Sequence, residues 1–395
     1  MTSPDQPTAK RLDVPPLLGL ADDLIGEIFL RLPTLEDVGR AATACPTFRR
    51  VIAGHAFLRR LRSVHPARLL GFLYGPDFHP AEPPHPSAPY ARALARAADF
   101  SFAFVPFPSA GPWFLRDVRD GRVLFENSMV AGELAVANPV FRRYALLPAA
   151  PIPDDMAAPV LEQSRLHLES FLVPAGEEEE DPASFRVICI AVSRARLIAF
   201  VFSSADGGWC AFPCQDWSNV AMNTGADLDF QLSWRYMVGG CLYWRVAWTN
   251  WLLVLDMRCM EFSFSEIPTD SLLTYCSAVA APEDGRPELF SIRDNALYST
   301  KQSDTGGANE WQSMEKVPVK LPWDYGFIVA GATEKYLLLQ GSGTSCGSYP
   351  PRVPMEYFSL ELKTMQLQKV CGLRSRYLNV NLYTGLPPSL SLPGL

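Results

Sequence analysis

A strand–turn–strand pattern that recurs along most of the chain limits the folds available to it more than any other feature. Each unit ends in a strand, a short turn and a final strand that carries aromatic residues. The five endings fall at Pro148, Pro213, Pro268, Pro318 and Gly372, roughly 50 to 65 residues apart. Repeats of this size with three or four strands are typical of β-propeller blades. We therefore expect an all-β repeat domain, a β-propeller of five to seven blades, with a large β-sandwich as the alternative.

Composition and periodicity divide the chain into five stretches. Residues 1–18 are polar and are expected to form a disordered tail, and residues 19–64 have the apolar periodicity of short helices. Residues 65–95 are rich in proline, which predicts a semi-rigid linker. The repeat domain follows over residues 96–385, and residues 386–395 are expected to be a second tail.

One further strand is predicted beyond the last repeat ending. The segment YLNVNLY, residues 377–383, alternates apolar and polar residues. A propeller has to join its last sheet to its first, because open sheet edges expose unpaired backbone groups. We expect this segment to close the ring.

The helical stretch has more apolar surface than a core of its size needs. Leu20, Leu24, Ile28 and Leu32 recur every four residues, and Ile25 with Phe29 forms a second stripe beside them. Thr34 followed by Asp37 resembles a capping box for the next helix. A module of about 45 residues with two apolar stripes is expected to complete its core against a partner.

The stretch LADDLIGEIFLRLPTLEDVGRAATACPTFRRVI, Leu20–Ile52, resembles an F-box. The order and spacing match the usual form: a leucine and an acidic pair, a helix rich in Ile and Leu, Leu-Pro, a second helix, Cys, and an aromatic residue with a basic pair. Ala21 and Phe48 stand where the family usually has Pro and Trp. With the strand-rich region behind it, the chain looks like a plant F-box protein of the grass type with an F-box-associated propeller.

This resemblance implies a substrate-recognition subunit of a Skp–cullin–F-box ubiquitin ligase. The F-box would bind a Skp-type adaptor, and through it a cullin–RING ligase, while the β domain binds an unknown protein substrate. The expected adaptor contacts are Leu20, Leu24, Ile28, Leu32, Val38, Cys45 and Phe48. For Val38 and Cys45 a place in the ordinary core is the competing interpretation. A protein-binding scaffold with no ligase connection is the alternative function, and a propeller hydrolase is a remote one.

Charge and cysteine content limit the cellular compartments and the classes of binding partner that we expect. The formal net charge is −7, which argues against nonspecific binding to nucleic acid or anionic membranes. Nine cysteines without a repeated spacing do not form a disulfide framework, and the polar N-terminus lacks a signal peptide's apolar core. These features predict a cytoplasmic or nuclear protein with no membrane segment.

No residue pattern predicts catalysis, a metal or a cofactor. Gly343-Thr344-Ser345-Cys346-Gly347 fits a nucleophile-elbow string, but prolines follow it and no histidine lies beyond His167. Cys210 and Cys214 have no second pair of ligands at metal-binding spacing. The histidines of the Pro-rich stretch, among them His79 and His85, have no acidic or cysteine partners nearby and are expected to be solvated. We therefore expect a protein that is not an enzyme.

A cluster of aromatic residues gives the one candidate for substrate recognition in the repeat domain. Trp, Tyr and Arg dominate the energetic hot spots of protein interfaces. Such residues gather around the predicted hairpin that spans residues 241–256: Tyr243, Trp244, Arg245, Trp248 and Trp251. Packing inside a blade is the competing interpretation.

Overall fold

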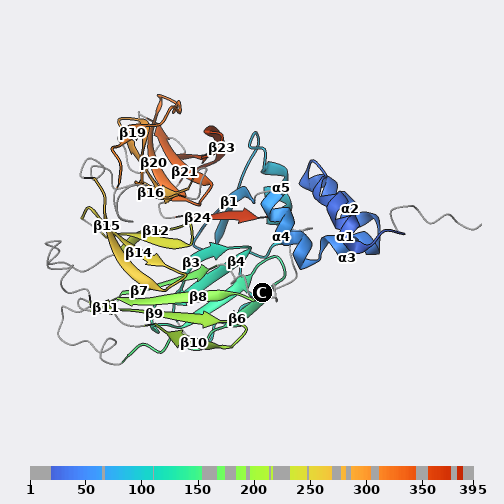
Figure 1. Cartoon of the computed structure of the whole chain (residues 1–395), viewed down its shortest axis with the longest axis horizontal. Helices are drawn as coiled ribbons and strands as arrows, with labels where there is room; N and C mark the ends of the chain where they lie inside the picture. Colours follow the sequence, from blue (N-terminus) through green and yellow to red (C-terminus); the bar gives the residue numbers. More distant parts are fainter. Residues whose placement is uncertain are drawn as a thin grey trace, which may run out of the picture. The chain divides into compact units, whose positions relative to one another are not determined.

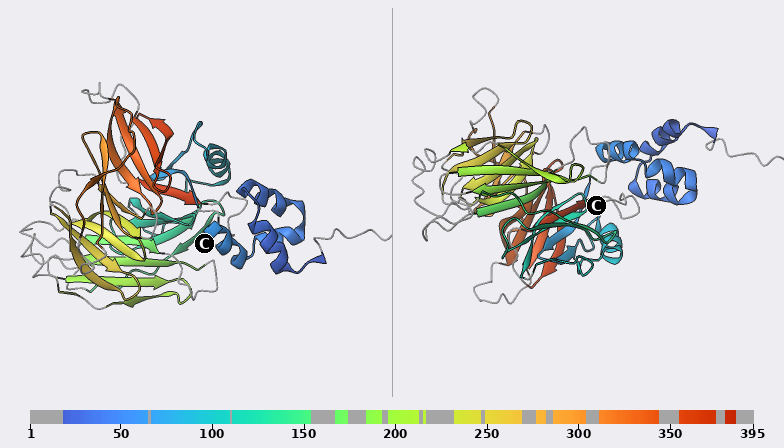
Figure 2. Two further views of the ribbon diagram at one scale, coloured as in Figure 1. Left: turned by 45° about the horizontal axis from the view of Figure 1, so that its top comes forward. Right: turned by 90° about the horizontal axis from the view of Figure 1, so that it is seen from below.

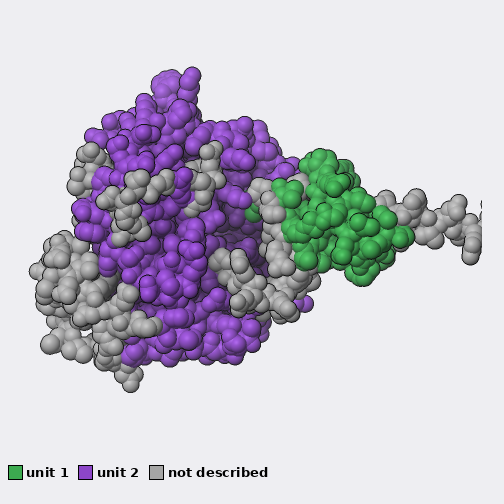
Figure 3. All heavy atoms as spheres, viewed as in Figure 1, with its two compact units in different colours: residues 1–67, 386–392 green, residues 68–385, 393–395 purple. Residues whose placement is uncertain are grey.

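The computed structural model of the chain contains two compact units, residues 1–67 with 386–392 and residues 68–385 with 393–395 (Figure 3). The structure describes residues 19–64, 67–109, 111–153, 167–173, 184–192, 196–212, 215–216, 232–246, 249–268, 277–281, 286–303, 311–343, 355–374 and 380–385. The predicted tails, 1–18 and 386–395, lie outside these ranges. Each unit has its own hydrophobic core.

The first unit is made of short helices. They are α1 (Asp22–Leu30), α2 (Leu35–Ala44), α3 (Pro46–Ile52) and α4 (His55–Val64). At the start of α2 the Asp37 backbone N–H donates to Thr34 Oγ1 (3.2 Å), which is the N-cap half of the predicted capping box, and the Asp37 carboxylate accepts from the Thr34 hydroxyl (2.6 Å). The Thr34 hydroxyl is also the main reason why the pKa of Asp37 is lowered. Cys45 caps the next helix, with its Sγ accepting from the Phe48 N–H at 3.4 Å.

The second unit is a six-bladed β-propeller, within the predicted range of five to seven blades. The first sheet contains β3 (Trp113–Arg119), β4 (Arg122–Asn127), β5 (Leu134–Asn138) and β6 (Arg143–Leu146). The second contains β7 (His167–Val173), β8 (Arg186–Val192), β9 (Arg196–Ser203), β10 (Gly208–Ala211) and β11 (Gln215–Asp216). The third contains β12 (Leu232–Val238), β13 (Cys241–Val246), β14 (Trp251–Asp256) and β15 (Glu261–Glu266). The next two are β16 (Ser277–Ala280), β17 (Glu288–Arg293), β18 (Ala296–Lys301) and β19 (Glu315–Lys316); and β20 (Tyr325–Ala332), β21 (Tyr336–Gly343), β22 (Met355–Glu361) and β23 (Gln366–Leu373).

We number these five sheets as blades one to five in chain order. The sheets follow one another in the colours of Figures 1 and 2, from the cyan β3–β6 through green and yellow to the orange β20–β23. Every strand pair within a blade is antiparallel. The first strand of each blade is the innermost, since β3 neighbours β7, β12 neighbours β16, and β16 neighbours β20.

The sixth sheet, the closing blade, joins distant parts of the chain. It has the order β2-β1-β24, with β1 (Arg68–Tyr74), β2 (Asp77–Pro80) and β24 (Asn381–Gly385). Strands β1 and β24 are labelled next to each other in Figure 1, and in their register Arg68 pairs with Gly385 and Leu73 with Asn381. The prediction that residues 377–383 contribute the closing strand is therefore confirmed for the described part of that segment.

The prediction of a Pro-rich linker over residues 65–95 is wrong. The stretch contains β1 and β2 and most of helix α5 (Ala88–Ala97), and the propeller begins at Arg68. Strand β1 is apolar, and five consecutive residues of its seven are buried. Pro80 ends the edge strand β2, where a missing backbone N–H breaks no ladder.

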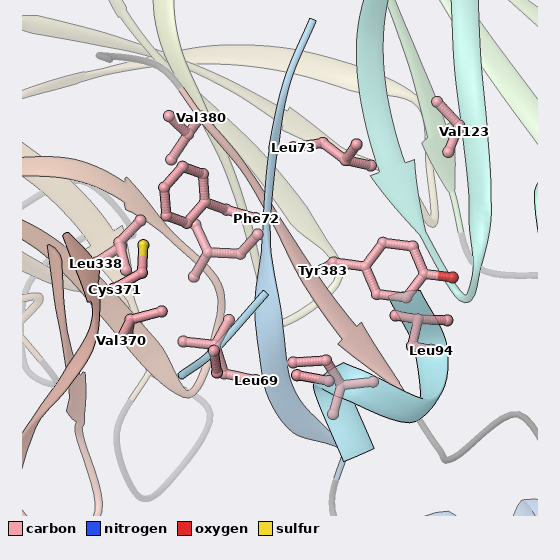
Figure 4. Close-up of a cluster of buried hydrophobic side chains, with 14 of the residues drawn as sticks. Leu69, Phe72, Leu73, Leu94, Val123, Leu338, Val370, Cys371, Val380 and Tyr383 are labelled. Atoms are coloured by element: carbon pink, nitrogen blue, oxygen red, sulfur yellow. The ribbon is translucent and has the colours of Figure 1, made fainter. Parts of the chain in front are cut away.

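A large aromatic and aliphatic core holds the closing blade to its neighbours. Figure 4 shows side chains from β1, α5, β4, β21, β23 and β24 converging there. Phe72 is fully buried and its ring lies 4.9 Å from that of Tyr357 on β22. Tyr383 on β24 packs edge-on against Phe78 and Phe100 at 5.6 and 5.9 Å. Burial of the Tyr383 side chain raises the pKa of its hydroxyl group.

Candidate functional site

The first helix of unit 1 presents one apolar face to its own core and another to solvent. Ile25 and Phe29 are almost fully buried, and Phe29 packs edge-on against Phe48 with 5.0 Å between ring centroids. On the other face, Leu24 and Ile28 are 53% and 40% exposed. Leu20, just before the helix, is 37% exposed. We call Leu20, Leu24 and Ile28 the α1 stripe.

Two exposed ion pairs join α1 to the neighbouring helices α3 and α4. Arg50 of α3 lies 2.9 Å from the Asp22 carboxylate at the start of α1. Arg60 of α4 pairs with Glu27 in the middle of α1, and this hydrogen bond is the main cause of the lowered pKa of Glu27. Exposed pairs add little to stability, about 0–1 kcal/mol each. The buried side chains of Ile25, Phe29 and Leu30 therefore hold α1 in place, and the stripe faces outward on the other side of the helix.

The other predicted adaptor residues lie in different surroundings. Val38 is completely buried in the core of unit 1, so the core interpretation holds for it and Val38 is not available to a partner. Leu32 and Phe48 are half-buried and pack against the same core. Cys45 is half-buried and caps α3. Among the seven predicted contacts, the structure brings the three α1 stripe residues together as an exposed surface.

The predicted aromatic patch of the propeller is largely interior, which corrects that prediction. Tyr243 and Trp244 are 5% and 1% exposed, because consecutive residues of β13 face the two cores on either side of the third blade. Arg245 is buried as well, with Nη1 3.5 Å from Ser277 Oγ. Trp251 is half-buried, and Trp248 lies outside the described residues.

Trp244 joins the second and third blades. Its ring packs edge-on against Phe171 of β7 at 5.6 Å. Its indole N–H has no hydrogen-bond partner in the part of the chain that the structure describes. Burial of such a donor without a partner is unfavourable, so the packing of its large apolar ring accounts for its position.

An ion network between three blades was not predicted. Arg235 of β12 donates to Glu169 Oε1 of β7 at 2.8 Å and lies 3.1 Å from Asp117 Oδ1 of β3. Its guanidinium group also lies 4.8 Å from the centroid of the Phe171 ring. The three charged side chains are 12–21% exposed, so they are poorly screened by water. The guanidinium plane thus connects the inner strands of the first three blades.

A second ion pair sits beside this network in the first blade. Arg116 Nε donates to Glu126 Oε2 at 2.5 Å. Burial raises the pKa of the Glu126 carboxyl group, and the Arg116 charge opposes that shift. Each carboxylate here has a nearby arginine, so the group forms a satisfied structural network rather than a set of free acids and bases.

Neither a metal centre nor a nucleophile emerges from the described residues. No group of three His, Cys, Asp or Glu side chains there could hold a metal ion. Cys210 is exposed, while Cys214 and residues 344–347 of the elbow-like string lie outside the described ranges. Burial raises the pKa of the Cys189 and Cys371 thiols to about 12 in both cases, which disfavours thiolate formation. None of the described helices has the length and apolar character needed to cross a membrane.

The expectation that the histidines of the Pro-rich stretch are solvated is wrong for His85. This side chain is 6% exposed, its Nε2 lies 3.1 Å from Ser359 Oγ, and its Nδ1 accepts from the Ser87 backbone N–H at 3.1 Å. Burial lowers the pKa of His85. His79 is half-buried, and burial lowers its pKa too.

Comparison with known proteins adds fold likeness alone. No protein-family model matches the chain, and no curated protein matches it. Among solved structures, YCF48 from Cyanidioschyzon merolae is 12% identical with a TM-score of 0.37, over 63% of this chain and 66% of that chain. YjhT is 10% identical with a TM-score of 0.35, over 68% and 86% of the two chains. The Dos1 propeller is 10% identical with a TM-score of 0.33, over 66% and 59%. Likeness at this level assigns neither a family nor an activity.

Proposed function

We propose that this chain is the substrate-recognition subunit of a Skp–cullin–F-box ubiquitin ligase, with no chemistry of its own. In this proposal the α1 stripe binds a Skp-type adaptor, and the propeller binds a protein substrate. The observation that carries the proposal is the exposure of Leu24 and Ile28 on a helix whose opposite face is packed, together with Leu20 just before that helix. The resemblance of Leu20–Ile52 to an F-box supplies the kind of partner.

The energetics of the stripe favour a bound partner. Burial of one exposed Leu or Ile side chain contributes about 1.5–3 kcal/mol. The helix does not need the stripe for its own fold, because Ile25, Phe29 and Leu30 already anchor it. An apolar surface that the fold itself does not use is typical of an interaction site.

Pull-down of a Skp-type adaptor by the full chain tests the proposal. Ile28→Asp places a charge in the centre of the stripe, and we expect it to abolish adaptor capture. Val64→Asp is the matched control, since Val64 is also apolar and 54% exposed but lies on α4. Adaptor binding that survives Ile28→Asp would overturn the assignment of the α1 stripe as the contact surface. A wild-type chain that captures no adaptor would overturn the ligase assignment and favour a scaffold with no ligase connection.

A further inference from the structure

The segment between strand β2 and helix α5, residues 81–87, is tied to two blades at once. On one side, the Ala81 N–H donates to the Leu70 carbonyl oxygen of the closing blade at 2.9 Å. On the other side, the Glu82 N–H donates to the Val370 carbonyl oxygen of the fifth blade at 2.7 Å. We call residues 81–87 the seam segment, because it connects the closing blade with the outermost strand of the fifth blade.

The side chain of His85 makes the second contact of the seam segment with the fifth blade. Its Nδ1 accepts the Ser87 backbone N–H at 3.1 Å, so the proton of the neutral ring sits on Nε2. Nε2 lies 3.1 Å from Ser359 Oγ on β22, and this hydroxyl group donates in turn to the Gln368 carbonyl oxygen of β23 at 3.5 Å. Both ring nitrogens therefore have a partner, and only the neutral ring satisfies both contacts.

A second proton on His85 is incompatible with this arrangement. Protonation of Nδ1 would place its N–H opposite the Ser87 N–H, so two donors would face each other and the hydrogen bond would be lost. Ser87 is also the N-cap residue of α5, and the partial positive charge of a helix N-terminus disfavours a cation there. The His85 side chain is 6% exposed, so water does not replace the lost partner. The protonated ring is therefore more stable outside its site than inside it.

No charged side chain among the described residues offsets this effect on His85. The elements that meet at the seam segment carry several titratable groups: Glu82 on the segment itself, Asp77 and His79 on β2, Glu361 on β22, Lys369 on β23 and Arg92 on α5. Burial alone lowers the pKa of His85, so none of these groups contributes to the shift. A proton gained by this ring thus has no carboxylate to stabilise it inside the site.

We propose that His85 is an acid-operated latch of the propeller ring. In its neutral form it holds the seam segment and the start of α5 on the fifth blade. On gaining a proton it releases them, and the propeller opens locally between the closing blade and the fifth blade while the other blades stay closed. The proposal concerns the propeller alone, so it does not depend on the ligase assignment above.

Two buried cysteines make a local opening measurable. Cys371 on β23 directly follows Val370, the residue bonded to the seam segment, and is 2% exposed in the core that Figure 4 shows. Cys189 on β8 is fully buried in the second blade, which does not adjoin the seam segment. Burial raises the pKa of both thiols to about 12. Their thiolate fractions therefore change with pH by the same factor, and the ratio of their labelling rates reports local opening.

The test labels the folded full chain with a small aromatic disulfide at pH 7.5 and pH 5.5 and measures both cysteines by mass spectrometry. We expect the ratio of Cys371 to Cys189 labelling to rise several-fold in acid, towards a limit of roughly tenfold. That limit applies to a histidine that titrates at its ordinary value of 6.5 once released and stays unprotonated while buried. Labelling that increases equally at both cysteines would indicate global unfolding and would overturn the inference, as would an unchanged ratio.

Variants separate the latch from other titrating groups. His85→Asn removes the titration, so its labelling ratio should be the same at both pH values. Ser359→Ala removes the Nε2 partner but keeps the ring, so its ratio should be higher at both pH values and still rise in acid. His79→Asn is the matched control, because burial also lowers the pKa of His79, and its ratio should rise as in the wild-type chain. A rise that His85→Asn keeps and His79→Asn loses would assign the effect to β2 and contradict the latch.

Discussion

Arg235 of the third blade and Asp117 of the first blade form an ion pair, Nη2 to Oδ1 at 3.1 Å, between two blades that are not consecutive in the chain. The two residues are 118 positions apart in the sequence, and the side chain of Glu169 on the intervening blade completes the contact at 2.8 Å. A single guanidinium group thus contacts the innermost strands of three consecutive blades. Arginine suits this position because its planar group donates in several directions at once.

Arg235→Gln should destabilise the propeller by about 3–5 kcal/mol, the usual cost of removing one partner of a buried ion pair. The reason is that Asp117 and Glu169 would remain as poorly hydrated carboxylates facing each other. Arg258→Gln is the control, because Arg258 is 81% exposed beside Asp256 and should cost about 0–1 kcal/mol. Urea unfolding of both variants measures the difference, and equal effects would contradict a special role for Arg235.

Gly71→Ala should weaken the closing blade. Gly71 has φ +149°, and a Cβ atom there would overlap the His79 carbonyl oxygen and lie 3.0 Å from the Pro80 Cα. Both neighbours are backbone, so they cannot move aside as a side chain could. We expect a lower melting temperature by thermal denaturation. Gly240→Ala also has a positive φ, +80°, but no atom within 4 Å of the added carbon, so it separates backbone strain from the close contact.

A chain that ends after Leu373 lacks β24 and should lose cooperative unfolding of the propeller. Its absence would leave β1 without its inner partner and would expose the core around Phe72. A chain that ends after Gly385 keeps the whole strand and should melt as the full chain does. Differential scanning calorimetry compares the two, and an unchanged transition in the shorter chain would exclude a closing role for β24.

Stability should fall with acid through His85. Its Nδ1 accepts the Ser87 N–H, so the proton of the neutral ring sits on Nε2 and is donated to Ser359. Burial lowers the folded-state pKa below the ordinary value of 6.5. Just below pH 6.5 the unfolded chain therefore binds more protons than the folded chain, and the free energy of unfolding decreases as the pH falls.

His85→Asn keeps an acceptor for Ser87 but removes the titration. We expect this variant to be less stable at pH 7.5 by about 1 kcal/mol, from the lost Ser359 contact, and to depend less on pH below 6.5. Urea titrations at pH 7.5, 6.5 and 5.5 measure both effects. A pH slope identical to that of the wild-type chain would mean that other groups account for acid sensitivity; His79, whose pKa is also lowered, is one of them.

The two faces of α1 should respond differently to truncation. Phe29→Ala removes a nearly buried ring and should cost about 3–5 kcal/mol of stability in unit 1. Leu24→Ala removes a side chain that is 53% exposed and should leave stability nearly unchanged while weakening adaptor capture. Circular dichroism melts paired with the pull-down make the comparison, and a similar stability loss in both variants would contradict the division of faces.

Periodicity along the chain predicted those parts of the architecture that depend on residues close together in the sequence. The repeat endings predicted a propeller, and the alternation in residues 377–383 predicted the strand that closes it. The prolines on both sides of β1 led to the prediction of a linker there, although LLGFLY between them is an apolar run of strand length. Prolines beside a segment such as β1 limit where the strand can begin and end, but they do not exclude a strand between them.

The sites were harder to predict because they depend on distances that the sequence does not contain. The α1 stripe follows from helical spacing, and the structure leaves its three residues exposed. Tyr243 and Trp244 have the composition of a recognition patch, but β13 lies inside its blade and buries both. Nothing near Arg235 in the sequence indicates its partners on β3 and β7.

The closing blade has a consequence for how the chain is made. Strands β1 and β2 leave the ribosome before the five sheets from β3 to β23, and β24, the inner partner of β1, leaves after all of them. Five blades can therefore be complete while the ring is still open, and the apolar side chains around Phe72 stay uncovered until Tyr383 packs against them. Translation that stops before Asn381 releases a chain with an uncovered seam, so the fold itself distinguishes a chain that contains β24 from one that lacks it.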